Sequence, residues 1–200
     1  MTVFHEPAFY NDLTEILSEG WRLMARGVAD RRSPFHHPTV ATLGLDGRPS
    51  LRTVILRGCH VASRTLRFHT DDRSTKVQEI TNDPRLAVHF YDATAKIQLR
   101  LDGIATLHHT DAVANSAWAA TRSFSRQCYG ITPGPGVKLA GGKDFTLPET
   151  TDEATAPGRV NFCPVTVEIK SMEWLYLAAS GHRRARFSWN ETMSAQWLTP

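Results

Sequence analysis

The chain has 200 residues, of which 41% are hydrophobic, and carries a formal net charge of +3 at pH 7. This length and apolar content suit one domain with a full core, so we expect residues 1–200 to form a single domain. The basic residues are interspersed with acidic ones, which argues against nucleic acid as the main partner. No apolar run reaches membrane-spanning length and the first residues lack a signal-peptide pattern, so the sequence predicts a soluble, cytoplasmic protein.

The cysteines and histidines do not form a recognisable metal motif. Cys59, Cys128 and Cys163 are widely separated and lack C-x-x-C spacing, which predicts neither a disulfide framework nor a zinc site. Two histidine pairs, at 36–37 and 108–109, are adjacent in the chain. Adjacent side chains point in different directions on a strand or a helix, so neither pair chelates a metal by itself. The sequence therefore predicts no metal site.

The spacing of apolar residues predicts short strands with peripheral helices. Residues 12–27 have a helical apolar stripe and Asp12 as N-cap. Residues 39–45 and 50–57 are expected to form a hairpin across Asp46 and Gly47, a strong turn signal. Glycine, proline, threonine and acidic residues dominate 132–159, which predicts a long surface loop. The remaining expected elements are strands at 66–70, 85–91, 96–107 (the longest), 162–170, 174–178, 183–189 and 196–198, and helices at 74–81 and 110–121.

Successive strands with hairpin-length gaps, rather than alternating strands and helices, predict a mainly β protein built as an antiparallel barrel. Alternation along 96–107 places Gln98 and Arg100 on a polar face, opposite the apolar residues. We expect a half-buried sheet.

The stretch from Arg52 to Lys76 has the residue types of a phosphate site. Ser74 stands where it can cap a short helix, whose free N–H groups and positive dipole end favour an anion, and Lys76 lies in the first turn. Arg52 and Arg57 lie on the neighbouring run. Arginines on a half-exposed strand and a Ser-Thr-Lys helix start are also ordinary solvent-facing features, so the residues alone leave both interpretations open.

Several motifs in order resemble the pyridoxamine 5′-phosphate oxidase family of FMN-binding split barrels. They are R-T-V-I-L-R at 52–57, F-H-T-D-D-R-S-T-K at 68–76, N-D-P-R at 82–85 and Q-L-R-L-D-G at 98–103, followed by M-E-W-L at 172–175 and H-R-R-A-R-F at 182–187. The resemblance implies an antiparallel split β-barrel, FMN as cofactor, and a homodimer with the flavin at the subunit interface.

The same resemblance assigns roles to individual residues. The phosphate is expected at Arg52, Ser74, Thr75 and Lys76, and the flavin ring at the backbone of 54–56, at Thr70 and at Gln98, while Arg186 matches an arginine that the neighbouring subunit contributes. Arg57 and Arg184 are expected nearest the reacting face. The complete set of predicted cofactor-binding residues is Arg52, Thr53, Val54, Ile55, Leu56, Arg57, His69, Thr70, Ser74, Thr75, Lys76, Gln98 and Arg186.

The residues expected at the substrate depart most from the family pattern. Where the oxidases place a tyrosine, an arginine and a serine, this chain has Trp118, Arg122 and Arg126, and its H-R-R-A-R segment exchanges arginine and histidine at His182 and Arg184. The resemblance thus implies an FMN-dependent oxidoreductase acting on a small, anionic substrate that the sequence does not identify. The alternatives are a non-catalytic flavin- or haem-binding barrel that serves as carrier or sensor, and, less compatible with the modest charge, an oligonucleotide-binding barrel.

Overall fold

The computed structural model describes residues 7–200, whose strands form one antiparallel sheet. The strand order is β2-β1-β5-β6-β7-β4-β3, and β8 pairs with β7 and β9. β2 and β3 follow one another in the chain but lie at opposite ends of this order, and no pairing joins them within the described residues. The sheet is therefore a split barrel that does not close, which confirms the expected fold class. The strands are β1 Thr39–Leu43, β2 Pro49–Thr53, β3 Leu56–His60, β4 Thr65–Asp71, β5 Arg85–Asp92, β6 Ile97–Leu107, β7 Phe162–Tyr176, β8 Arg183–Trp189 and β9 Met193–Leu198.

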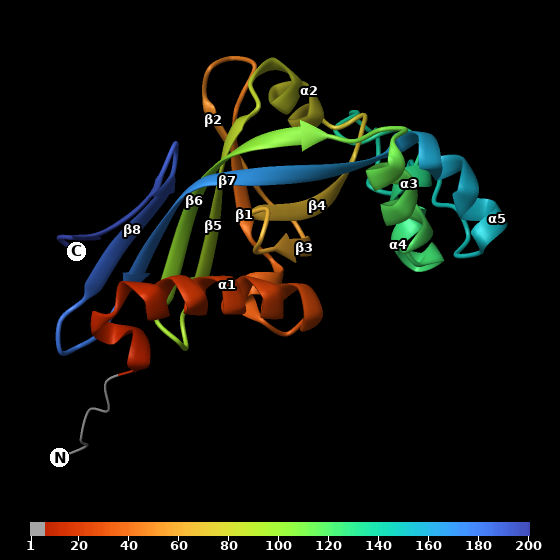
Figure 1. The fold of residues 1–200 in the computed structure, drawn as a ribbon. Coiled ribbons are helices and arrows are strands. Elements are labelled where there is room, and N and C mark those ends of the chain that lie inside the picture. Colours follow the sequence, from red (N-terminus) through yellow and green to blue (C-terminus); the bar gives the residue numbers. More distant parts are fainter. Residues whose placement is uncertain (1–6) are drawn as a thin grey trace.

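Helices cover the edge and the ends of this sheet (Figure 1). The amphipathic helix is confirmed: Asp12 caps α1 by accepting from the N–H groups of Thr14 and Glu15, and Ile16 and Met24 are fully buried in the core. The three short helices α3, α4 and α5 gather at one end of β7, whereas β8 lies at its other end (Figure 1). No helix of the described chain is long and apolar enough to span a membrane. The α-helices are α1 Leu13–Ala29, α2 Thr75–Asn82, α3 Ala112–Ala119, α4 Ser123–Arg126 and α5 Asp152–Thr155, with 3-10 turns at Ala8–Asn11, Pro34–His36, Gln127–Gly130 and Ala156–Asn161.

The predicted hairpin is correct, but the prediction of one strand over 50–57 is wrong. β2 ends at Thr53, which pairs with Thr39, the first residue of β1. Pro38 precedes that residue and offers only its carbonyl, which accepts from the N–H of Val54 at 2.9 Å. Beyond Thr53, β1 has no further residue with which β2 can pair. The chain therefore crosses to the other edge of the sheet, where Leu56 pairs with Phe68 of β4.

β7 corrects a second prediction, because the chain forms one strand of 15 residues over Phe162–Tyr176 rather than two strands, and β7 rather than β6 is the longest. The polar residues near 171–173 interrupt the apolar pattern in the sequence. In the fold they find partners across the sheet: Ser171 Oγ donates to Asp102 at 2.7 Å, and Glu173 accepts from Arg100 and Arg184. The ladder therefore continues through this segment.

The core confirms the predicted alternation. Leu99 and Leu101 of β6 are fully buried, while Arg100 between them is exposed. β7 contributes Met172 and Trp174 to the same core, also fully buried. Residues 132–159 are largely exposed as expected, although they also contain α5 and a two-residue bridge between Thr132 and Thr146.

Candidate functional site

Three residues predicted at the phosphate, Arg52, Ser74 and Lys76, come together with Thr70, predicted at the flavin ring, where β2, β4 and α2 meet. Lys76 Nζ donates to Thr70 Oγ1 at 2.9 Å and to Ser74 Oγ at 3.2 Å, and the two hydroxyl oxygens are 3.2 Å apart. Arg52 lies close enough for its charge to act on Lys76. We call Arg52, Thr70, Ser74 and Lys76 the cation cluster.

The Lys76 ammonium has no carboxylate partner among residues 7–200 and contacts only the two hydroxyls. Burial, followed by the neighbouring Arg52 guanidinium, lowers the pKa of Lys76 below its ordinary value. The charges of Asp71 and Glu79 act in the opposite direction, but neither carboxylate is bonded to the ammonium. The cation cluster thus has both the charge and the hydrogen-bond donors that phosphate oxygens require.

Glu79 also belongs to this site, although the sequence analysis did not identify it. Arg52 Nη2 lies 2.6 Å from Glu79 Oε2, which also accepts from Thr42 Oγ1 at 2.6 Å. The Glu79 side chain is only 4% exposed. Burial alone would raise the pKa of Glu79, but hydrogen bonds from Thr42, Ser50 and Arg52 outweigh it and hold the pKa below its ordinary value. Glu79 follows Lys76 by three residues on α2, where an acidic residue usually faces solvent.

Ser74 stands at the N-cap position of α2, but the predicted side-chain cap is wrong. Its hydroxyl makes no hydrogen bond with the helix and is directed to Thr70 and Lys76 instead. Charge-assisted hydrogen bonds are stronger than those to a backbone N–H, so the half-buried ammonium takes this oxygen. Thr75, the first residue of α2, is exposed beside the cluster.

A second group of predicted residues lies on the opposite face of β4. His69 is half-buried against Phe162, with ring centroids 4.8 Å apart. Burial, then the charges of Arg67 and Arg57, lower the pKa of His69 to about 3, so its ring is neutral at pH 7. Its Nε2 is buried without a hydrogen-bond partner in the described chain. Residues 53–56 connect this group to the cation cluster, and Val54 and Leu56 are buried while Thr53 and Ile55 are exposed.

The remaining predicted flavin and substrate residues form what we call the distal group, near β8. The register places Gln98, Leu175 and Arg184 side by side on three neighbouring strands. Arg184 Nη2 donates to Glu173 Oε1 at 3.0 Å, whereas the Gln98 side chain makes no hydrogen bond within residues 7–200. Nδ1 of the exposed His182 lies 3.1 Å from the Ala178 carbonyl oxygen. The distal group is Gln98, His182, Arg184 and the exposed Arg186.

Thr70 of the cation cluster and the distal group lie at opposite ends of β7. Thr70 pairs with Cys163 near the start of this strand, and Gln98 and Arg184 pair with Leu175, twelve residues further along. At about 3.3 Å per residue this is roughly 40 Å of strand. Figure 1 shows β7 running from the α3–α5 end of the molecule to β8. One chain therefore does not bring all the predicted flavin residues together.

Three of the five residues predicted at the substrate, Trp118, Arg122 and Arg126, lie in the helical region at the start of β7. Arg126 lies over the ring of Trp118, 4.8 Å from its centroid, and donates to the Trp118 carbonyl at 2.9 Å. It also lies 3.4 Å from Asp152 of α5. Trp118 in turn packs edge-on against Phe162 at 5.1 Å. Arg126 thus ties α3 to α5, while Arg122 is exposed to solvent.

The comparisons with known proteins agree with this arrangement. The family profile described as pyridoxamine 5′-phosphate oxidase, FMN-binding domain, matches residues 18–109, which span α1 to the end of β6 and include the cation cluster. Over this segment the chain matches the pyridoxamine 5′-phosphate oxidase-like family. Three of the four members of the distal group, and all five predicted substrate residues, lie outside the matched segment.

The curated relatives are oxidases in this family. Pyridoxine/pyridoxamine 5′-phosphate oxidase 2 of Arabidopsis thaliana is 31% identical over 126 residues, which cover 58% of this chain and 63% of that protein. The oxidase of Thermosynechococcus vestitus is 40% identical over 94 residues, covering 46% of this chain and 44% of its own. The chain spans less than two thirds of the length of the curated relatives it matches.

Two solved structures share the fold over nearly the whole chain. PhzG of Burkholderia lata 383, solved in complex with tetrahydrophenazine-1-carboxylic acid, superposes with a TM-score of 0.71 at 18% identity, covering 99% of this chain and 98% of its own. A pyridoxamine 5′-phosphate oxidase-related, FMN-binding protein of Nostoc punctiforme gives 0.68 at 21% identity, covering 98% and 99%. At such identities these likenesses establish the fold alone.

Proposed function

We propose that the protein is an FMN-dependent oxidoreductase, whose cation cluster binds the flavin phosphate. The observation that carries this proposal is the half-buried Lys76 ammonium, which lies beside Arg52 and, within residues 7–200, has hydroxyls but no carboxylate as partners. The match of residues 18–109 to an FMN-binding domain supports it.

The donor set of the cluster fits a phosphate monoester. Lys76 supplies an ammonium, Thr70 and Ser74 supply hydroxyls, and Thr75 lies at the exposed start of α2, where helix N–H groups favour an anion. Arg52 shares its guanidinium with Glu79, so it adds positive field while its own orientation is fixed by that carboxylate. The bound flavin would supply two-electron chemistry, and the protein would supply binding, orientation and charge.

Arginines then provide for an anionic substrate. Arg57 and Arg67 lie near the neutral His69 on the outer face of β3 and β4. Arg122, which follows Trp118 closely in the sequence, is exposed to solvent. Planar guanidinium groups suit carboxylates and phosphates, which they bind through paired hydrogen bonds. Residues outside the matched segment, such as Arg184 and His182, would set which anion is accepted.

We further propose a homodimer in which the distal group of one copy completes the flavin site of the other. The separation of roughly 40 Å along β7 supports this, because one chain alone keeps the two groups apart. Exposed apolar side chains on the outer face of β1, β2 and β6 offer an interface for a second copy: Leu43, Leu51 and Ile104 are 39%, 63% and 37% exposed.

The test is flavin titration of the flavin-free protein, with Lys76→Met compared with Lys138→Met. Lys138 is exposed in the 132–159 segment and serves as a matched loss of one charge. A lost charge-assisted hydrogen bond of about 1.5–3 kcal/mol should weaken FMN binding roughly 10- to 150-fold in Lys76→Met, with no change in Lys138→Met. Equal FMN affinity in both variants and the parent would contradict the assignment.

Sedimentation velocity tests the dimer separately. The parent protein should sediment as a dimer, and Leu51→Glu, which places a charge in the apolar interface, should sediment as a monomer with weaker FMN binding. A monomeric parent that binds FMN at full affinity would rule out the shared site while leaving the cation cluster in place.

A further inference from the structure

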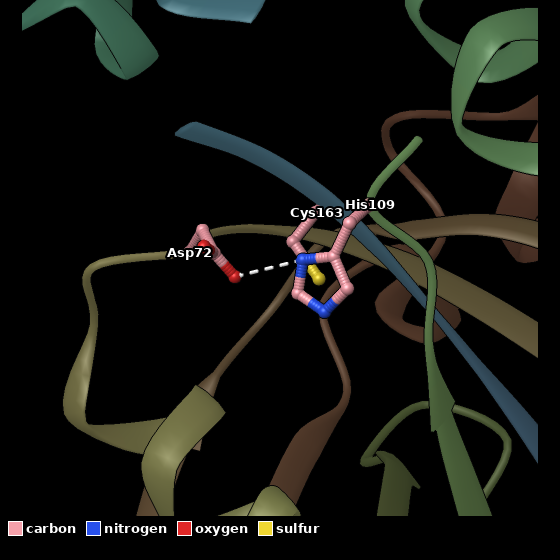
Figure 2. Close-up of side chains that lie close together, drawn as sticks. All are labelled: Asp72, His109 and Cys163. Carbon is pink, nitrogen blue, oxygen red and sulfur yellow. Dashed lines mark ion pairs between the residues drawn. The ribbon is translucent and has the colours of Figure 1, made fainter. Parts of the chain in front are cut away.

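A group of three side chains with metal-binding atoms lies next to the cation cluster, and the proposed flavin function does not use it. Asp72, His109 and Cys163 each present one oxygen, nitrogen or sulfur atom, and these atoms all lie within 4.8 Å of one another. Figure 2 shows the three side chains converging, with the Asp72 carboxylate and the His109 ring joined by an ion pair. In the sequence, Asp72 and His109 are 37 positions apart, and His109 and Cys163 are 54 positions apart, so no spacing motif links the three residues.

The backbone at each of these positions is held by the sheet or by its contacts. Cys163 pairs with Thr70 in the β4–β7 ladder. The N–H of Asp72 donates to the Asn161 carbonyl at 2.7 Å. The carbonyl of His109 accepts from Arg159 at 2.8 Å. Cys163 is thus held in a strand, and a backbone hydrogen bond fixes each of the other two donors just beyond the ends of β4 and β6.

The polar atoms of the group are incompletely satisfied. His109 Nδ1 lies 3.1 Å from Asp72 Oδ1, but the pair is not aligned as a hydrogen bond, and Oδ1 is buried without a hydrogen-bond partner in the described chain. Cys163 is fully buried, and its thiol has a weak contact at 3.6 Å with the Pro164 carbonyl and a hydrogen bond with the backbone of His108. A buried carboxylate oxygen without a partner is costly and calls for a cation or a donor.

We propose that Asp72, His109 and Cys163 bind a divalent transition-metal ion of the zinc class. One sulfur, one nitrogen and one oxygen donor is a combination that zinc takes, with metal–ligand distances of about 2.0–2.3 Å. Tetrahedral geometry then places the donors roughly 3.3–3.7 Å apart. The two outer side chains, 49% exposed at His109 and 37% at Asp72, are free to rotate by the small amount needed.

Three protein ligands leave the fourth tetrahedral position open to water or to an oxygen of a ligand. Because Asp72 and His109 are partly exposed, the ion enters from solvent and Cys163 closes the site from inside. The burial of Cys163 argues against the other chemistry that a cysteine, a histidine and an aspartate can perform, since a nucleophilic thiol must reach its substrate.

The test uses the full chain without a histidine tag, treated with chelator and titrated with Co²⁺ as a spectroscopic probe. One equivalent of Co²⁺ should produce a thiolate-to-cobalt charge-transfer band and the visible bands of a tetrahedral site, and Zn²⁺ should displace both. Cys163→Ser should lose the charge-transfer band. Asp72→Asn and His109→Gln, at partly exposed positions, should each weaken Zn²⁺ binding by roughly 100-fold or more.

Cys128→Ser and His108→Gln are matched controls, because each removes the same residue type outside the group, and both should keep the Co²⁺ spectrum. Absence of the thiolate band in the parent protein would overturn the proposal. So would its persistence in both Asp72→Asn and His109→Gln, a result that holds even if Cys163→Ser fails to fold. Flavin affinity measured on the same variants distinguishes this site from the cation cluster, where Lys76→Met should leave the Co²⁺ spectrum intact.

Discussion

Removal of Arg52 is expected to destabilise the fold as well as weaken anion binding, because this arginine neutralises a buried carboxylate. Arg52 Nη2 lies 2.6 Å from Glu79 Oε2, and the two side chains are 20% and 4% exposed. Removing one partner of a buried pair costs about 3–5 kcal/mol. Since Arg52 keeps some contact with solvent, we expect about 3 kcal/mol for Arg52→Met.

The assay is urea unfolding of the flavin-free protein at pH 7 and at fixed protein concentration. With an m-value of about 2 kcal/mol/M, a loss of about 3 kcal/mol lowers the unfolding midpoint by about 1.5 M. Adding Glu79→Gln removes the charge that Arg52→Met leaves without its partner. The double variant should therefore recover at least half of the lost stability, while Thr42 still donates to the amide oxygen.

Acid titration provides a second check of the same pair. In the parent protein the pKa of Glu79 lies below its ordinary 4.5, so the stabilisation is complete above that value and is lost as the pH falls through the lower, folded-state pKa. In Arg52→Met the carboxyl is buried without the guanidinium, which raises its pKa, so the difference between the two proteins should shrink on acidification. Additive effects of the two substitutions, or a pH-independent difference, would refute the reasoning.

Three further predictions follow from individual contacts. FMN affinity should fall as the pH rises through the lowered pKa of Lys76, because the ammonium is lost, and Lys76→Arg should remove this alkaline decline in a fluorescence titration. Gly103→Ala should lower the free energy of unfolding, followed in a thermal melt, by about 1–3 kcal/mol, because the new Cβ would lie 2.6 Å from Val167 Cγ1. Gly47→Ala should lower it by about 1 kcal/mol, because there the new Cβ has open space and the only penalty is the backbone φ of 79°. His69 stays neutral in the folded protein down to its pKa of about 3, whereas the unfolded chain takes up a proton at this residue near pH 6.5. The free energy of unfolding should therefore decrease as the pH is lowered from 6.5 to 3, and His69→Gln should make it less dependent on pH in this range.

Local pattern was enough to predict most elements. The helix capped by Asp12, the Asp46-Gly47 turn and the alternation of β5 and β6 are confirmed, because each depends on residues a few positions apart. The contact between Thr70, Ser74 and Lys76 also depends on local sequence alone, since the end of a strand and the first turn of the next helix are adjacent in the chain. Family resemblance supplied the expectation of FMN, which spacing alone left open.

Long-range pairing decided what the sequence did not. The break between β2 and β3 depends on where β1 begins, and the continuity of β7 depends on partners that Asp102 and Arg184 offer to its polar residues. The spacing argument against a metal site considered neighbours such as His108 and His109, whereas the structure joins His109 to residues of two other elements.

The strand and helix content, the polar and apolar faces, and the residue types suited to a phosphate follow from the order of residues, because side-chain periodicity and helix-end chemistry are local properties of the chain. Three contacts and separations arise on folding alone: Glu79 pairs with Arg52, Asp72 lies beside Cys163, and Gln98 lies at the far end of β7 from Thr70. These contacts depend on sheet order and register, which are set by which strands find one another and cannot be read from the spacing within any one strand.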